Sequence, residues 1–128
     1  MIRLRRLSLV LAMASITPAV GCSHFMHHDP DEPPAQVIFV NQSLDQADVY
    51  VVGDAGDSQR IGTVFAGRTE TLTIPNNVLA RGGSVSIAAR LLARTYVPRT
   101  GPITFSRSQQ LQITLPSDER SLTVLPAP

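Results

Sequence analysis

The sequence predicts an all-β fold, an antiparallel β-sandwich of about seven strands, over residues 36–125. Short runs rich in Val, Ile, Leu and Thr recur along this region, and Gly, Asn, Asp and Ser join most of them. No segment places its apolar residues at the 3.6-residue period of a helix, and no β-α-β alternation indicates a doubly wound sheet. Strands spaced about a dozen residues apart are typical of sandwiches and of small barrels, so a small β-barrel is the alternative.

Four strands are predicted in the first half of the domain. Residues 36–40 (QVIFV) are apolar on both faces, and residues 47–52 (ADVYVV) follow after a turn. Residues 53–58 (GDAGDS) predict a hairpin loop, because glycine accepts a positive φ and aspartate can bond its own backbone. The chain returns as a third strand over 60–65 (RIGTVF). In the fourth, 69–74 (TETLTI), leucine and isoleucine alternate with threonine.

The clearest strand of the chain is predicted over residues 84–93. Pro75 ends the preceding strand, and residues 76–80 predict one helical turn before Gly82-Gly83. Within 84–93 the alternate positions are apolar, which places one set of side chains on a single face: Val85, Ile87, Ala89, Leu91 and Ala93.

The last third of the domain is predicted to add three shorter strands. Residues 96–102 form a loop that contains prolines, and residues 103–105 form a short edge strand. Residues 109–115 alternate polar and apolar side chains, and residues 121–125 form a final strand before a tail at 126–128.

This rhythm of strands and turns is similar to that of small immunoglobulin-like and transthyretin-like domains in exported bacterial proteins. The resemblance covers about residues 36–125 and implies a two-sheet sandwich. The chain has no Trp and one Cys, so it lacks the Cys-Trp-Cys arrangement of antibody domains.

The N-terminal residues have the parts of a secretory signal. Three arginines precede an apolar run, and small residues follow it up to Gly21. The 14 residues from Leu7 to Val20 are fewer than the roughly 20 of a membrane-spanning helix. The sequence therefore predicts an exported protein with a signal peptide over residues 1–21.

The end of this signal, Ala19-Val20-Gly21-Cys22, resembles the lipobox of bacterial lipoproteins, although a lipobox usually has Leu where Ala19 stands. The resemblance implies cleavage before Cys22 and a diacylglyceryl anchor, with fatty acids such as palmitate, on its sulfur. Cys22 is the only cysteine, so it cannot form an internal disulfide. Ser23 in place of an Asp implies the outer membrane, facing the periplasm. The alternatives are an ordinary cleaved signal with an incidental cysteine and a short uncleaved anchor.

Residues 22–35 are predicted to be a tether between the anchor and the domain. Three prolines and three acidic residues keep this segment extended and prevent it from forming a core. It also contains every histidine of the chain, His24, His27 and His28, which are candidate ligands for Zn²⁺ or Cu²⁺. The alternative is a solvated linker, because a flexible segment fixes no metal geometry.

The net charge argues against one class of partner. All eleven basic residues are Arg, and loss of residues 1–21 would leave eight of them against ten acidic residues. A weakly acidic domain argues against binding to nucleic acid, which requires a clustered basic face.

No catalytic constellation is recognisable. The chain has no G-x-S-x-G elbow, and its histidines all lie in the tether, which argues against a Ser-His-Asp hydrolase. Asp54 and Asp57 lack the spacing of a calcium loop and are interpreted as a hairpin tip. The sequence therefore predicts no enzyme and no cofactor.

One group of residues suggests ligand binding. Arg90, Arg94, Arg99 and Arg107, together with Tyr96, lie in the second half of the domain. Arg90, Arg94 and Tyr96 are the candidates for binding a carboxylate or an anionic glycan, because a guanidinium binds such groups in a bidentate manner. The alternative is that these arginines protect a sheet edge from other chains.

Together these features predict a membrane-anchored envelope lipoprotein whose domain is a non-enzymatic binding or accessory module. Its expected partners are the membrane, through the lipid, and another envelope protein or a cell-wall component. The alternative is a periplasmic protein that handles a metal or small ligand through the His-rich tether.

Overall fold

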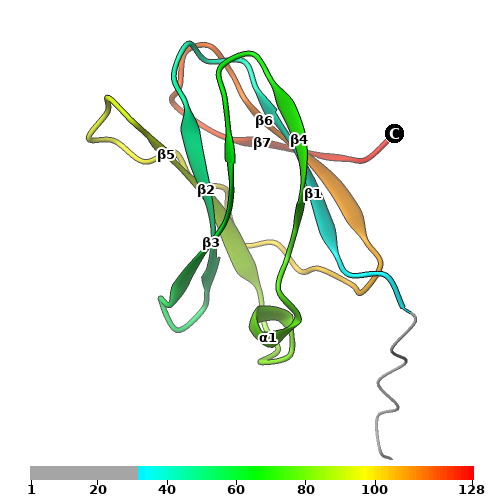
Figure 1. Cartoon of the computed structure of the whole chain (residues 1–128). Coiled ribbons are helices and arrows are strands. Elements are labelled where there is room, and N and C mark those ends of the chain that lie inside the picture. The colour runs from blue at the N-terminus through cyan, green and yellow to red at the C-terminus, as the bar shows by residue number, and fades with distance from the viewer. Residues whose placement is uncertain (1–31) are drawn as a thin grey trace, which may run out of the picture.

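The computed structural model describes residues 32–128, which contain seven strands, one helical turn and the loops that join them (Figure 1). In chain order they are β1 (Gln36–Asn41), β2 (Ala47–Gly53), β3 (Ser58–Val64), β4 (Thr69–Thr73), α1 (Asn76–Leu79), β5 (Val85–Leu91), β6 (Gln110–Leu115) and β7 (Thr123–Pro126). No helix within residues 32–128 is long and apolar enough to cross a membrane.

The strands form two sheets that pack face to face, one with the order β4-β1-β6-β7 and one with the order β3-β2-β5. The predicted β-sandwich is therefore confirmed, and the sheets do not close into a barrel. One pairing departs from the antiparallel prediction, because β1 and β6 run parallel, with Phe39 beside Ile113. These strands are far apart in the sequence, and a local pattern of apolar residues does not reveal which distant strands pair.

The core lies between the two sheets and consists of alternate residues from both inner faces. Its fully buried side chains include Phe39 of β1, Ile87 of β5 and Ile113 of β6. On β5 the predicted inner face is correct from Val85 to Leu91, but Ala93 is exposed because the strand ends at Leu91.

The predicted edge strand over 103–105 is wrong. Residues 98–103, which overlap that range only at Ile103, lie along the free edge of β5 instead, where Thr100 N–H donates to the Ile87 carbonyl at 2.9 Å. Ile103 N–H donates to the Val85 carbonyl at 2.7 Å, and only isolated bridges form. Pro98 and Pro102 have no N–H, which prevents a continuous ladder. This segment nevertheless covers the β5 edge.

The strands β1 to β5 run alternately in opposite directions, residues 98–103 return antiparallel to β5, and β6 and β7 are again antiparallel, so the connections gather at two ends of the sandwich (Figure 1). We call the end with Glu32 the entry end; it also carries α1 and the β2–β3 hairpin. The opposite end, here the far end, carries the loops 42–46, 65–68, 92–96 and 116–122. At the entry end Ser108 Oγ donates to Glu32 Oε1 at 3.1 Å, which fastens the start of the domain to the turn before β6.

A buried asparagine joins two loops of the far end. The Asn41 side-chain amide donates to the carbonyls of Asp45, at 2.8 Å, and Val64, at 3.0 Å. Its oxygen accepts from the Ser43 N–H at 3.0 Å and from Ser43 Oγ at 2.7 Å. The third loop is attached by Leu92 N–H, which donates to the Gln46 carbonyl at 3.2 Å. These contacts fix the three loops relative to one another.

Candidate functional site

The three predicted ligand-binding residues lie in two different places. Arg90 is on β5, whereas Arg94 and Tyr96 are in the far-end loop that follows this strand. They line two separate surface hollows. Arg94 and Tyr96 line one at the far end, and Arg90 lines one on the outer face of the β3-β2-β5 sheet. The structure therefore does not bring Arg90 together with Arg94 and Tyr96.

In the far-end hollow, of about 340 Å³, the predicted residues contact other parts of the chain. Arg94 Nε donates to Glu119 Oε2 at 2.7 Å and lies 3.7 Å from Asp45 Oδ2. The hydrogen bond and charge of Glu119, with the charge of Asp45, raise the pKa of Arg94 above its ordinary value. Tyr96 Oη donates to the Arg120 carbonyl at 3.0 Å. These contacts hold the 92–96 loop against the 116–122 turn.

The second hollow, of about 270 Å³, lies on the outer face of β3-β2-β5. Ala88 of β5 is in register with Tyr50 of β2 on one side and with Arg99 of the edge segment on the other. Directly opposite residues of an antiparallel pair share a face, so these three side chains lie in a row across the sheet. The complete lining consists of Tyr50, Val52, Ser58, Ala88, Arg90, Val97 and Arg99.

The charges around this hollow are unbalanced. Asp48 is the register partner of Arg90, but its carboxylate contacts β3 instead, where it lies 3.1 Å from Arg60 Nη2 and accepts from Thr63 Oγ1 at 2.7 Å. Within residues 32–128, no carboxylate oxygen lies within 4.0 Å of a side-chain nitrogen of Arg90 or Arg99. The hollow therefore carries two guanidinium groups without an acidic partner from the domain.

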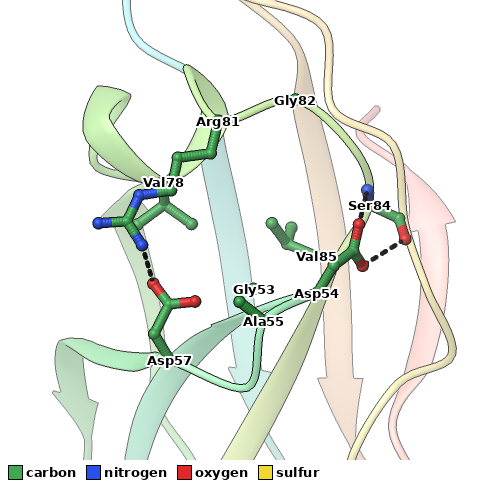
Figure 2. A pocket seen from close by; sticks show the side chains of 9 residues that line it. All are labelled: Gly53, Asp54, Ala55, Asp57, Val78, Arg81, Gly82, Ser84 and Val85. Atoms are coloured by element: carbon green, nitrogen blue, oxygen red, sulfur yellow. Dashed lines mark hydrogen bonds and ion pairs between the residues drawn. The ribbon is translucent and has the colours of Figure 1, made fainter.

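A third hollow, of about 130 Å³, lies at the entry end between the β2–β3 hairpin and the α1–β5 connection (Figure 2). Asp54 accepts from both the N–H and the Oγ of Ser84 at 2.9 Å, and Asp57 Oδ2 lies 2.7 Å from Arg81 Nη1. The two carboxylates thus bind separate partners, as Figure 2 shows. This geometry agrees with a hairpin tip and not with a shared calcium site.

Replacing Gly83 with alanine is expected to destabilise the domain more than replacing Gly56. Both glycines have a positive φ, +90° and +84°, which costs an L-residue about 1–2 kcal/mol. A Cβ at Gly83 would also overlap the Asp54 carboxylate, whereas a Cβ at Gly56 meets nothing within 4 Å. Urea unfolding should therefore show Gly83→Ala about 1–2 kcal/mol less stable than Gly56→Ala, because Asp54 must release Ser84. Equal losses would contradict this role of Asp54.

The predicted lipidation residue Cys22 and the predicted metal ligands His24, His27 and His28 lie outside the described residues, so both hypotheses stay predictions. Within residues 32–128, no group of three or more His, Cys, Asp or Glu side chains is placed to hold a metal ion.

Comparison with known proteins identifies no family. No protein-family model matches the chain, and no curated protein matches it. Among solved structures, the chain is similar to an NMR structure of a protein from Eubacterium rectale, with 11% sequence identity and a TM-score of 0.47. The match covers 77% of this chain and 94% of that chain.

Proposed function

We propose that this protein is a lipid-anchored module of a bacterial envelope, at the outer membrane facing the periplasm, and that it binds another envelope protein through its far end. The lipobox-like sequence ending at Cys22 supports the anchor. The observation that carries the binding role is a set of uncovered apolar side chains at the far end, which we call the apolar tip: Leu44, Phe65, Leu92 and Tyr96.

The apolar tip is held by hydrogen-bonded loops. Leu44 precedes Asp45 and Phe65 follows Val64, and the carbonyls of Asp45 and Val64 accept from the same Asn41 amide. Leu92 is attached to the first loop through its own N–H. Leu44, Phe65 and Leu92 are 93%, 63% and 80% exposed. Large apolar side chains that are exposed on neighbouring loops are typical of an interaction site.

An anchor at Cys22 would present this tip away from the lipid, because the chain enters the sandwich at the opposite end. Nine residues lie between Cys22 and Glu32, which allows an extended tether of about 30 Å. The charges beside the tip are mixed, with Arg94 paired to Asp45 and Glu119, whereas an anionic lipid surface favours a basic cluster. The apolar tip therefore fits a partner protein with an apolar groove better than it fits the surface of another lipid bilayer.

The proposed role is non-enzymatic. Every histidine precedes residue 32, so no serine of the sandwich has a histidine from the same domain as its general base. The carboxylates of Asp45, Asp48, Asp54, Asp57 and Glu119 all bind arginine or serine side chains of the domain. A binding role accounts for the exposed side chains of the apolar tip and requires no catalytic step.

Photo-crosslinking in cells that produce the full chain tests the binding role. A benzophenone side chain placed at Leu44 is expected to give one discrete adduct, because this position lies in the apolar tip. The matched control places the same group at Ala55, which is also exposed but lies at the entry end. Phe65→Ser combined with Leu92→Ser should lower the yield at position 44 at least fivefold. No adduct from position 44, or equal adducts from both positions, would contradict the proposal.

A further inference from the structure

We propose that the hollow on the outer face of the β3-β2-β5 sheet binds an organic carboxylate, with Arg90 and Arg99 holding the carboxylate and Tyr50 contacting the apolar body of the ligand. This site is distinct from the apolar tip and requires neither the tip nor the lipid anchor, so it extends the proposed function.

The cationic half of the site follows from the strand register. Arg99 is opposite Ala88, and Arg90 lies two residues further along β5 on the same face. The Cα atoms of such diagonal neighbours on adjacent strands are about 7–8 Å apart, so two long arginine side chains can reach one ligand group. A guanidinium presents two parallel N–H groups, which match the two oxygens of a carboxylate.

The domain supplies no competing acid at this place. Asp48, the acidic residue beside Arg90, is engaged by Arg60 and Thr63 on the β3 side of the sheet. Four other arginines of residues 32–128 do have a carboxylate within 4.0 Å: Arg60, Arg81, Arg94 and Arg107. Arg90 and Arg99 are therefore available to an external anion.

The apolar half of the site lies on the same face. Val52 and Ala88 point away from the core, since they alternate with Val51 and Ala89 of the inner face, yet they are only 7% and 4% exposed. They form an apolar floor between Tyr50 and Val97. An inorganic phosphate would satisfy the arginines but leave the half-buried Tyr50 and the exposed Val97 without a contact, so the site favours a carboxylate that carries an apolar or aromatic group.

The test titrates the full chain, in a non-ionic detergent, with three probes and follows backbone amide shifts by NMR. The probes are benzoate, a blocked Glu-Phe-Glu peptide and inorganic phosphate. Benzoate or the peptide should shift the amides of Tyr50 and Ala88 saturably, with a Kd of about 1 mM or lower. Tighter binding of the peptide indicates a protein segment as the source of the carboxylate, and equal or tighter binding of benzoate indicates a small acid. Phosphate should bind at least tenfold more weakly.

Arg90→Gln combined with Arg99→Gln is expected to weaken benzoate or peptide binding at least tenfold while the amide spectrum stays that of the folded sandwich. The matched control is Arg68→Gln, since Arg68 is exposed in a far-end loop and has no ion pair within residues 32–128. This control should leave binding unchanged. The proposal is overturned if neither carboxylate binds saturably, if phosphate binds as tightly as benzoate, or if the double variant binds as well as the control.

Discussion

Asn41→Ala is expected to lower the free energy of unfolding by about 3–4 kcal/mol. The side chain is 1% exposed and uses its full hydrogen-bonding capacity, with two bonds donated and two accepted. Alanine would leave the Ser43 amide and the Val64 carbonyl without this partner in a buried place, and the half-buried Asp45 carbonyl would keep only Ser43 Oγ as a side-chain donor. Each such buried group costs about 1–3 kcal/mol when it loses its hydrogen bond. Urea unfolding of the variant measures this loss.

Two further variants show whether the loss comes from this network. Gln42→Ala alters an exposed neighbour and should change stability by less than about 0.5 kcal/mol. Ser43→Ala combined with Asn41→Ala should cost clearly less than the sum of the single changes, because both residues belong to the same set of hydrogen bonds. A loss below about 1 kcal/mol for Asn41→Ala would mean that Asn41 does not join the far-end loops.

Local patterns in the sequence predicted the strands well. The alternation at Leu72 and Ile74, and at Val85, Ile87 and Ala89, corresponds to buried side chains in the structure. Gly56 of the hairpin loop, together with Gly82 and Gly83, adopts the positive φ that such turns require. These features depend on neighbours in the sequence, which is why residue type and spacing suffice to predict them.

The pairing of distant segments could not be predicted in the same way. Arg94 has the same chemistry as Arg90, but the turn that follows β6 brings Glu119 to Arg94 and no acid to Arg90. The proposed ligand site also depends on Tyr50, whose position beside Ala88 follows from the β2–β5 register. Tyr50 could not be predicted as a site residue, because register between strands is set by the assembled sheet. The role of Asn41 could not be predicted either, because a polar residue after a strand ordinarily indicates an exposed turn.

Cys22→Ser is expected to abolish lipidation completely and to leave unprocessed precursor in the inner membrane. The thiol is the group that would receive the diacylglyceryl chain, and a serine hydroxyl is a much poorer nucleophile. The sandwich should still fold, because its described contacts begin at Glu32. Ser23→Ala is the matched control and should be processed normally. Western blots of separated membrane fractions show precursor and mature forms, and normal maturation of Cys22→Ser would contradict the lipobox interpretation.

The mass of the N-terminal peptide, measured on the protein isolated from its own cells, tests the proposed anchoring most directly. We expect this peptide to start at Cys22 and to carry the added mass of a diacylglyceryl group, with or without a third acyl chain. A peptide that still contains residues 1–21, or one with a free thiol at Cys22, would contradict a lipid-anchored module.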